Sequence, residues 1–109
     1  MAASPALQAL AALSAHIGRD PLVTQAAGGN TSVKEGGRLW IKASGTWLAE
    51  ADQRDIFLPV ALDPLRAAIE AGDERAAKAT DFVIAEANPL GLRPSVETSV
   101  HAVFPQAVV

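Results

Sequence analysis

The feature that most limits how this chain can fold is a hairpin pattern near its middle. Residues 31–34 and 38–42 have the composition of strands, and a glycine-rich turn at residues 35–37 separates them. Such a turn favours antiparallel pairing of the strands it connects. In the second strand Leu39 and Ile41 occupy alternate positions, so one face of the hairpin is expected to be buried. The residues expected on its other face are Arg38, Trp40 and Lys42.

A helix is predicted before the hairpin. Ser4 suits the N-cap, Pro5 suits the first helical position, and Gly18 can take the left-handed conformation that ends a helix. The expected apolar stripe of this helix consists of Leu7, Leu10, Leu13 and Ile17.

Strand and helix patterns continue after the hairpin. A strand is expected over residues 55–60, with Pro59 at a sheet edge or at the strand's end. Asp63 and Pro64 then repeat the cap-and-proline pattern of a short helix that stops near Gly72.

The last part of the chain is predicted to hold two helices and the beginning of a strand. Residues 73–87 are expected to be helical, and Ser95 to cap a final helix. Residues 107–109 resemble the opening of a buried strand. The expected apolar stripe of the final helix is Val96, Val100 and Val103. Helices alternating with strands in this way indicate a layered α/β domain.

Composition narrows the possible functions. The 109 residues allow one small domain, and no apolar run is long enough for a membrane span. The absence of cysteine excludes disulfides, thiolate zinc sites and cysteine nucleophiles. With 9 basic and 12 acidic residues the formal charge is −3, which argues against nucleic-acid binding. We therefore expect a cytoplasmic protein that binds neither membranes nor nucleic acids.

Two small-residue loops have the groups needed to hold an anion. Residues 28–32 combine free backbone N–H groups with an amide and two hydroxyls, and Ser44 with Gly45 has a similar set after the hairpin. Taken alone, each segment is more often an ordinary tight turn, because glycine-rich turns are common.

A third segment places a carboxylate and a histidine on one helix face. Glu97 lies four residues before His101 in the predicted final helix. A favourable interaction with the helix dipole would by itself explain a glutamate at position 97. Alternatively, Glu97 and His101 could be two ligands of a metal ion. A complete zinc site needs three or four ligands, and no third histidine is nearby.

Taken together, these three segments resemble the N-terminal half of the class II aldolase/adducin family. They read Gly-Gly-Asn-Thr-Ser-Val-Lys at 28–34, Leu-Trp-Ile-Lys-Ala-Ser-Gly-Thr-Trp-Leu at 39–48 and Arg-Pro-Ser-Val-Glu-Thr-Ser-Val-His at 93–101. The match runs from about Leu22 to Val109 and is nearest to the aldolase domains fused to short-chain dehydrogenases. The order of the three segments makes the resemblance specific.

The resemblance implies both a fold and a reaction. The fold is a three-layer α/β/α sandwich with a mixed, mostly antiparallel central sheet, of which residues 1–109 would be the N-terminal portion, and the assembly is a homotetramer. The reaction is cleavage or condensation of a sugar or ketose phosphate. In the complete domain three histidines hold a divalent zinc that stabilises the enediolate, while a glutamate moves the proton.

Individual residues match the family's functional positions. Glu97 aligns with the catalytic acid/base, and His101 resembles a helix histidine of the family that is not a metal ligand. The positions that match the family's phosphate contacts are Gly29, Asn30, Ser44, Gly45 and Ser95.

The sequence departs from the family pattern in two places. Val96 stands where many sugar-phosphate members have a second serine, which leaves room for another substrate. The family's His-x-His metal pair follows the valine-rich strand, and this chain ends at Val108 and Val109. We therefore expect a truncated domain without metal ligands, with little or no turnover, because the cation supplies the largest stabilising term. Its open sheet edge should promote association.

Two other functions remain open. The chain could be a non-catalytic, adducin-like module for binding or self-association. It could also belong to a decarboxylase, epimerase or dehydratase on the same fold. A histidine pair encoded beyond Val109 would favour the enzyme.

Overall fold

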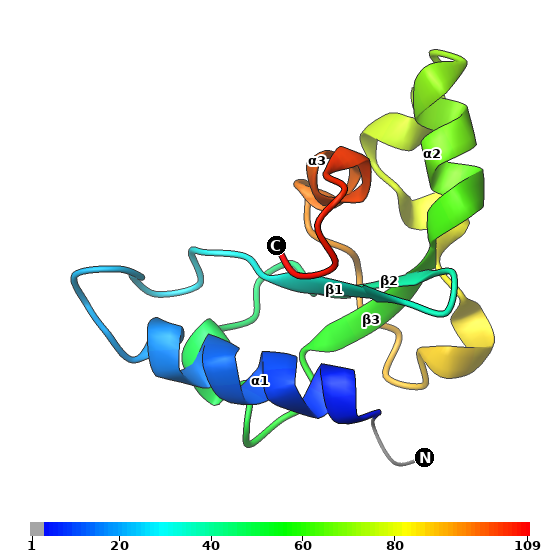
Figure 1. The fold of residues 1–109 in the computed structure, drawn as a ribbon. Helices are drawn as coiled ribbons and strands as arrows, with labels where there is room; N and C mark the ends of the chain where they lie inside the picture. The colour runs from blue at the N-terminus through cyan, green and yellow to red at the C-terminus, as the bar shows by residue number, and fades with distance from the viewer. Residues whose placement is uncertain (1–3) are drawn as a thin grey trace.

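The structure, a computed structural model that describes residues 4–109, is built around a three-stranded antiparallel sheet. Strands β1 (Ser32–Glu35), β2 (Arg38–Lys42) and β3 (Phe57–Ala61) lie side by side in that order (Figure 1). Gly36 and Gly37 form the two-residue turn between β1 and β2, with φ angles of 60° and 76°. A primed hairpin turn requires positive φ at both positions, which glycine adopts without strain. The predicted hairpin is confirmed.

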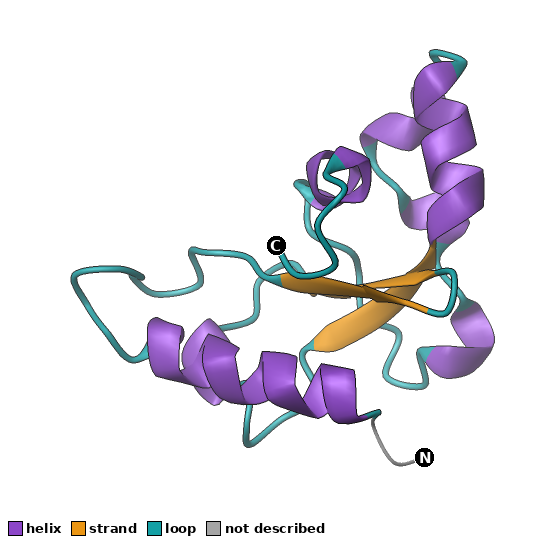
Figure 2. Ribbon diagram, in the orientation of Figure 1, coloured by secondary structure: helices purple, strands orange, loops and turns teal. Residues whose placement is uncertain are grey.

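Helices cover both faces of this sheet. Helix α1 (Pro5–Gly18) and the short 3-10 helix η1 (Leu48–Glu50) lie on one face, while α2 (Leu62–Glu70) and α3 (Thr98–Val103) lie on the other (Figure 2). This arrangement is the layered α/β architecture predicted from the sequence. None of the helices within residues 4–109 is both long and apolar enough to cross a membrane.

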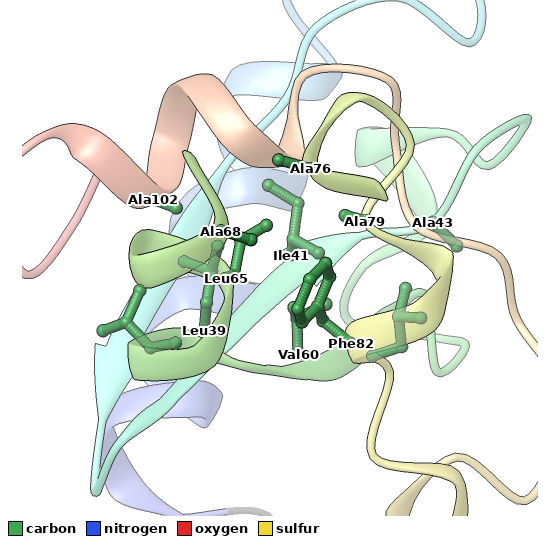
Figure 3. Packing of buried hydrophobic residues seen from close by; sticks show 12 residues of the cluster. Leu39, Ile41, Ala43, Val60, Leu65, Ala68, Ala76, Ala79, Phe82 and Ala102 are labelled. Carbon is green, nitrogen blue, oxygen red and sulfur yellow. The ribbon is translucent and has the colours of Figure 1, made fainter. Parts of the chain in front are cut away.

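The main core lies between the sheet and α2. Leu39 and Ile41 of β2 pack with Leu58 and Val60 of β3 against Leu65 of α2, and all five side chains are fully buried (Figure 3). Burying one such side chain contributes about 1.5–3 kcal/mol. The alternation of Leu39 and Ile41 therefore correctly predicted that these two side chains are buried, although helices cover the other face of the sheet as well.

Helix α1 begins as predicted but buries a different set of residues. The Ser4 hydroxyl accepts a hydrogen bond from the Leu7 N–H at 3.2 Å, with Pro5 in the first turn. Of the expected apolar stripe only Leu10 is fully buried, and Leu13 is half-exposed. The buried residues of the helix are Leu10, Ser14 and Ala15. A second, smaller core explains the shift, because it joins α1 to η1 through Ala15, Leu48, Ala51 and Ile56.

Gly18 has a role other than the predicted one. It does not adopt a positive φ, and Arg19 ends the helix in a right-handed conformation. A Cβ atom at Gly18 would lie 2.3 Å from the Ala49 backbone nitrogen. Glycine is required here because η1 packs directly against the helix backbone.

The helix predicted over residues 73–87 is wrong. This segment forms three 3-10 turns, at Glu74–Ala77, Thr80–Phe82 and Ala85–Ala87. Ala79 interrupts any continuous helix with a φ of 56°, and Val83 bridges to Val60 of β3. The Ile84 N–H donates to the Pro59 carbonyl at 3.0 Å. Pairing with the outer edge of β3 has replaced the local helical hydrogen bonds.

Helices α2 and α3 differ from their predictions in detail. Helix α2 starts at Leu62, so Asp63 lies in its first turn and is not the cap. Helix α3 is short, and Val96, Val100 and Val103 are 84%, 54% and 54% exposed. The predicted valine stripe is therefore not a core face. The buried side chains of α3 are Thr98, His101 and Ala102.

Residues 107–109 pair antiparallel with the free edge of β1. The Lys34 N–H donates to the Ala107 carbonyl at 2.7 Å, and the Ser32 N–H donates to the Val109 carbonyl at 2.9 Å. The strand-like conformation expected here is confirmed as a bridge between Val108 and Val33, but the segment is not buried, because Ala107 and Val108 are exposed.

Candidate functional site

The candidate site begins with a contact between residues far apart in the sequence. The Asn30 Nδ2 amide donates to the Ser95 Oγ at 2.6 Å, and the Glu97 backbone N–H donates to the same oxygen at 3.2 Å. Asn30 lies in the first small-residue loop, whereas Ser95 precedes α3 and Glu97 is its N-cap residue. The structure therefore joins the first and third segments singled out in the sequence.

The second small-residue loop lies against the same segment. The Ser44 N–H donates to the Arg93 carbonyl at 2.8 Å, and Ala43 forms an antiparallel bridge with Pro94. The side chain of Ser44 and the backbone of Gly45 are exposed. All three segments thus meet at one end of the β1–β2 hairpin. Which ligand they contact, and whether they contact one, stays a prediction.

Asn30 has a polar atom available for a ligand. Its Oδ1 is buried, and no hydrogen-bond partner for it is present among the described residues. Turning the amide over would pair Oδ1 with the Ser95 hydroxyl and leave Nδ2 unpaired in its place. In either orientation one amide atom lacks a partner, which costs free energy unless a ligand or water supplies one.

A buried histidine connects β1 to Glu97. His101 Nδ1 lies 2.7 Å from the Ser32 Oγ, and His101 Nε2 lies 3.9 Å from Glu97 Oε2. Ser32 and His101 are buried, while the Glu97 side chain is 58% exposed. Burial lowers the pKa of His101, the Glu97 carboxylate opposes this, and Lys34 adds to it. The lowered pKa favours the neutral imidazole, which lies between the Ser32 hydroxyl and the Glu97 carboxylate.

Two contacts hold α3 in this position. Arg66 Nε of α2 donates to the Ala102 carbonyl at 2.7 Å, and the Ser99 hydroxyl donates to the Ala76 carbonyl. Glu97 and His101 are therefore carried by a helix anchored on the main core.

Lys42 bonds to a residue beside each loop. Its Nζ donates to the Ala27 carbonyl at 3.0 Å and to the Thr46 carbonyl at 2.6 Å. Burial lowers the pKa of Lys42, and the Glu97 carboxylate opposes this shift.

A groove on the opposite face of the sheet does not include this site. It has a volume of about 630 Å³ and lies between α1, the sheet and residues 86–92, with Trp40 and Phe57 in its wall. None of the six predicted site residues lines it.

Comparison with known proteins identifies the family. The family model described as "Class II Aldolase and Adducin N-terminal domain" matches residues 8–107. The chain belongs to the class II aldolase and adducin family. A solved structure of the N-terminal class II aldolase domain of a conserved protein from Thermoplasma acidophilum is similar, with 29% identity and a TM-score of 0.73. The match covers 99% of this chain and 55% of that one, so this chain spans about half the length of its structural neighbour. The comparison with curated proteins gave no match.

Class II aldolases generally use a divalent metal. Residues 4–109 contain no cluster of three or more histidine, aspartate and glutamate side chains that could hold an ion. His101 and Glu97 are two candidate donors, and His101 Nδ1 is already bonded to Ser32. A catalytic zinc needs three protein ligands, so the side chains described here do not by themselves fit one.

The sequence did not predict the part that Lys42 and Ser32 play in this class II aldolase domain. Strand alternation places Lys42 on the polar face, and nothing in its neighbours signals that its ammonium is buried. Ser32 was part of a loop rich in hydroxyls, but its partner His101 lies 69 residues away. The spacing of Glu97 and His101 was the one available signal, and their side chains do face each other.

Proposed function

We propose that this chain is the part of a metal-dependent aldolase that binds a phosphorylated sugar or ketose and carries the acid/base carboxylate. The observation that supports this most directly is the Asn30–Ser95 contact at 2.6 Å, which joins the first small-residue loop to the segment that bears Glu97. The bond from the Ser44 N–H to the Arg93 carbonyl joins the second loop to the same segment.

In this proposal the loops bind the anionic end of the substrate. Backbone N–H groups near Gly29 and Gly45, with the hydroxyls of Ser44 and Ser95 and the amide of Asn30, supply short donors without steric bulk. Such a set suits the oxygens of a phosphate group. The family's divalent metal, with zinc as the first choice, would be held by ligands outside residues 4–109.

Glu97 would move a proton to and from the substrate carbon. Its carboxylate is more than half exposed, so a substrate can reach it, and His101 lies 3.9 Å away on the protein side. A positioned carboxylate of this kind contributes about 10²–10⁴-fold in general acid–base catalysis.

The anion-binding part can be tested on these 109 residues. Dihydroxyacetone phosphate added to the ¹⁵N-labelled protein should shift the amide signals of Gly29, Gly45 and Ser95. Dihydroxyacetone, which lacks the phosphate, serves as the matched ligand and should shift them far less. Equal responses to both compounds, or no response at concentrations of about 10 mM, well above ordinary KM values, would contradict the proposed anion site.

The role of Glu97 needs the metal-loaded protein that contains this chain. There Glu97→Gln should reduce turnover by about 10²-fold or more, because the amide cannot accept the proton. Glu86→Gln, on an exposed turn away from the site, is the matched control and should leave turnover unchanged. Near wild-type turnover in Glu97→Gln would remove Glu97 from the mechanism.

A second candidate function, self-association, is favoured by the outer face of α3. Val100 and Val103 of α3 are exposed, as are Val96 before the helix and Phe104 after it. Apolar side chains grouped on a surface mark sites of protein association. We propose a homo-oligomer that uses this face. Light scattering should show a mass above that of the monomer, and Val100→Ser should lower it. A monomer at all concentrations would contradict this.

A further inference from the structure

Lys42 breaks the alternation of its own strand. Arg38 and Trp40 are partly exposed, whereas Lys42 is only 3% exposed. A buried ammonium is costly unless its hydrogen bonds are satisfied. The bonds from Lys42 Nζ go to two backbone carbonyls, those of Ala27 and Thr46.

These carbonyls lie next to the two small-residue segments at residues 28–32 and 44–45. We call residues 26–30 the first loop and residues 43–46 the second loop, so that each loop includes its carbonyl. Each loop also has a local bond: the Gly28 N–H donates to the Gln25 carbonyl at 2.9 Å, and the Thr46 N–H donates to the Ala43 carbonyl at 3.3 Å. Asn30 and Ser44 bond separately to the segment before α3, through Ser95 and Arg93. Lys42 differs from these groups because its one ammonium bonds to both loops.

The charge of Lys42 also matters for what the loops can bind. Its two recorded partners are neutral carbonyls, and an ammonium has three donors, so they do not neutralise it. The Glu97 carboxylate acts on it at longer range and is itself mostly exposed. A positive charge bonded to both loops favours an anion bound between them.

We propose that Lys42 is a positioning residue whose buried ammonium holds the first and second loops, through Ala27 and Thr46, at the separation where one anionic group contacts both. The identity of that group rests on the proposed function; the link between the loops does not.

The unmodified protein gives the first test. In ¹⁵N,¹³C-labelled protein the Lys42 ammonium should give a slowly exchanging signal, with scalar couplings across the hydrogen bonds to the Ala27 and Thr46 carbonyl carbons. An ammonium in fast exchange with water and without these couplings would overturn the proposal. This measurement needs no variant, so it holds even if substitution of Lys42 prevents folding.

The second test compares Lys42→Met with Lys34→Met. Lys34, on the neighbouring strand, donates to the Gln106 carbonyl at 2.7 Å and is the matched control. In Lys42→Met the Gly28 and Thr46 amides should exchange with solvent about tenfold faster, beyond any change in the β2 amides that reports global stability. Uniform acceleration in loops and sheet, or none, would mean that Lys42 does not position the loops.

Binding of inorganic phosphate completes the design. If the loops hold a phosphate, Lys42→Met should weaken its binding about tenfold, which is 1.4 kcal/mol, and Lys34→Met should not. The same titration with acetate in place of phosphate shows whether the site binds carboxylates as well as phosphate. If the native protein binds neither anion while the loop amides still respond to Lys42→Met, the proposed function fails and the positioning role stands. If phosphate binds equally well to both variants with unchanged loop exchange, the positioning role fails and the proposed function stands.

Discussion

The centre of the sheet and the end that carries the candidate site follow opposite packing rules. Ile41 lies in an apolar core with Leu58 and Leu65. Ser32, its direct partner across β1 and β2, is bonded to the buried His101 instead. A single cross-strand pair therefore marks the boundary between an apolar region and a polar one.

The difference separates stability from ligand binding. Apolar burial in the centre stabilises the fold in proportion to the area removed from water. At the other end each buried polar group contributes little net stability, and an unpaired one is destabilising. Lys42, His101 and the Asn30 amide lie in that second region. The hydrogen bonds of these residues orient polar groups that could contact a ligand. The apolar core stabilises the sheet and helices on which these residues lie.

The largest loss of stability is expected for a substitution in the apolar region. Leu58→Ala should lower the free energy of unfolding by about 2–5 kcal/mol, because it removes a fully buried side chain and leaves a cavity. Urea denaturation measures this. Leu22→Ala, at a position 95% exposed, is the control and should change stability by less than about 0.5 kcal/mol. Equal losses in the two variants would contradict the placement of the core.

A smaller loss of stability is expected at Ser32, which lies at the boundary between the apolar and polar regions. Ser32→Ala should cost about 1–3 kcal/mol, because it leaves His101 Nδ1 buried without its partner. Ser44→Ala removes an exposed hydroxyl and should cost far less. Nitrogen-15 spectra of the imidazole should also change in Ser32→Ala, reporting altered tautomer populations. An unchanged His101 spectrum would show that Ser32 does not orient the ring.

The polar region should also respond to pH. Burial holds the pKa of His101 below its usual value, so between the folded pKa and about 6.5 the unfolded chain binds more protons. Stability should therefore fall as pH decreases below about 6.5, by at most about 1.4 kcal/mol per pH unit from this group. His101→Gln should remove that part of the slope. The free energy of unfolding, measured by urea denaturation across this pH range, gives the slope for each protein. If the native protein and His101→Gln have the same slope, His101 is not the source of the pH dependence.

The smallest change in stability is expected at Glu97. Because its side chain is mostly exposed, Glu97→Gln should alter the free energy of unfolding by less than about 0.5 kcal/mol. A thermal or urea melt in parallel with the turnover measurement checks this. A loss above about 1 kcal/mol would mean that Glu97 has a structural role, which would weaken any argument from lost activity.

Local patterns predicted the elements whose bonds are local. Gly36 with Gly37 determined the hairpin turn, and Ser4 with Pro5 determined the start of α1, since each depends on a few neighbouring dihedral angles. The helix expected over residues 73–87 failed because Val83 and Ile84 bond to β3, a partner that helical propensity cannot anticipate. The exposed valines of α3 show the same limit: periodicity finds a stripe but not what covers it.

The sequence by itself determined the hairpin, the layered architecture and the three segments that converge, because turn chemistry and strand alternation act over a few residues. Only the tertiary structure decided that Asn30 contacts Ser95, that His101 turns toward Ser32 and Glu97, and that the Lys42 ammonium lies beneath two loops. These contacts join residues up to 69 positions apart. Their free energy depends on burial and on donor geometry, which exist only once the sheet and helices have packed.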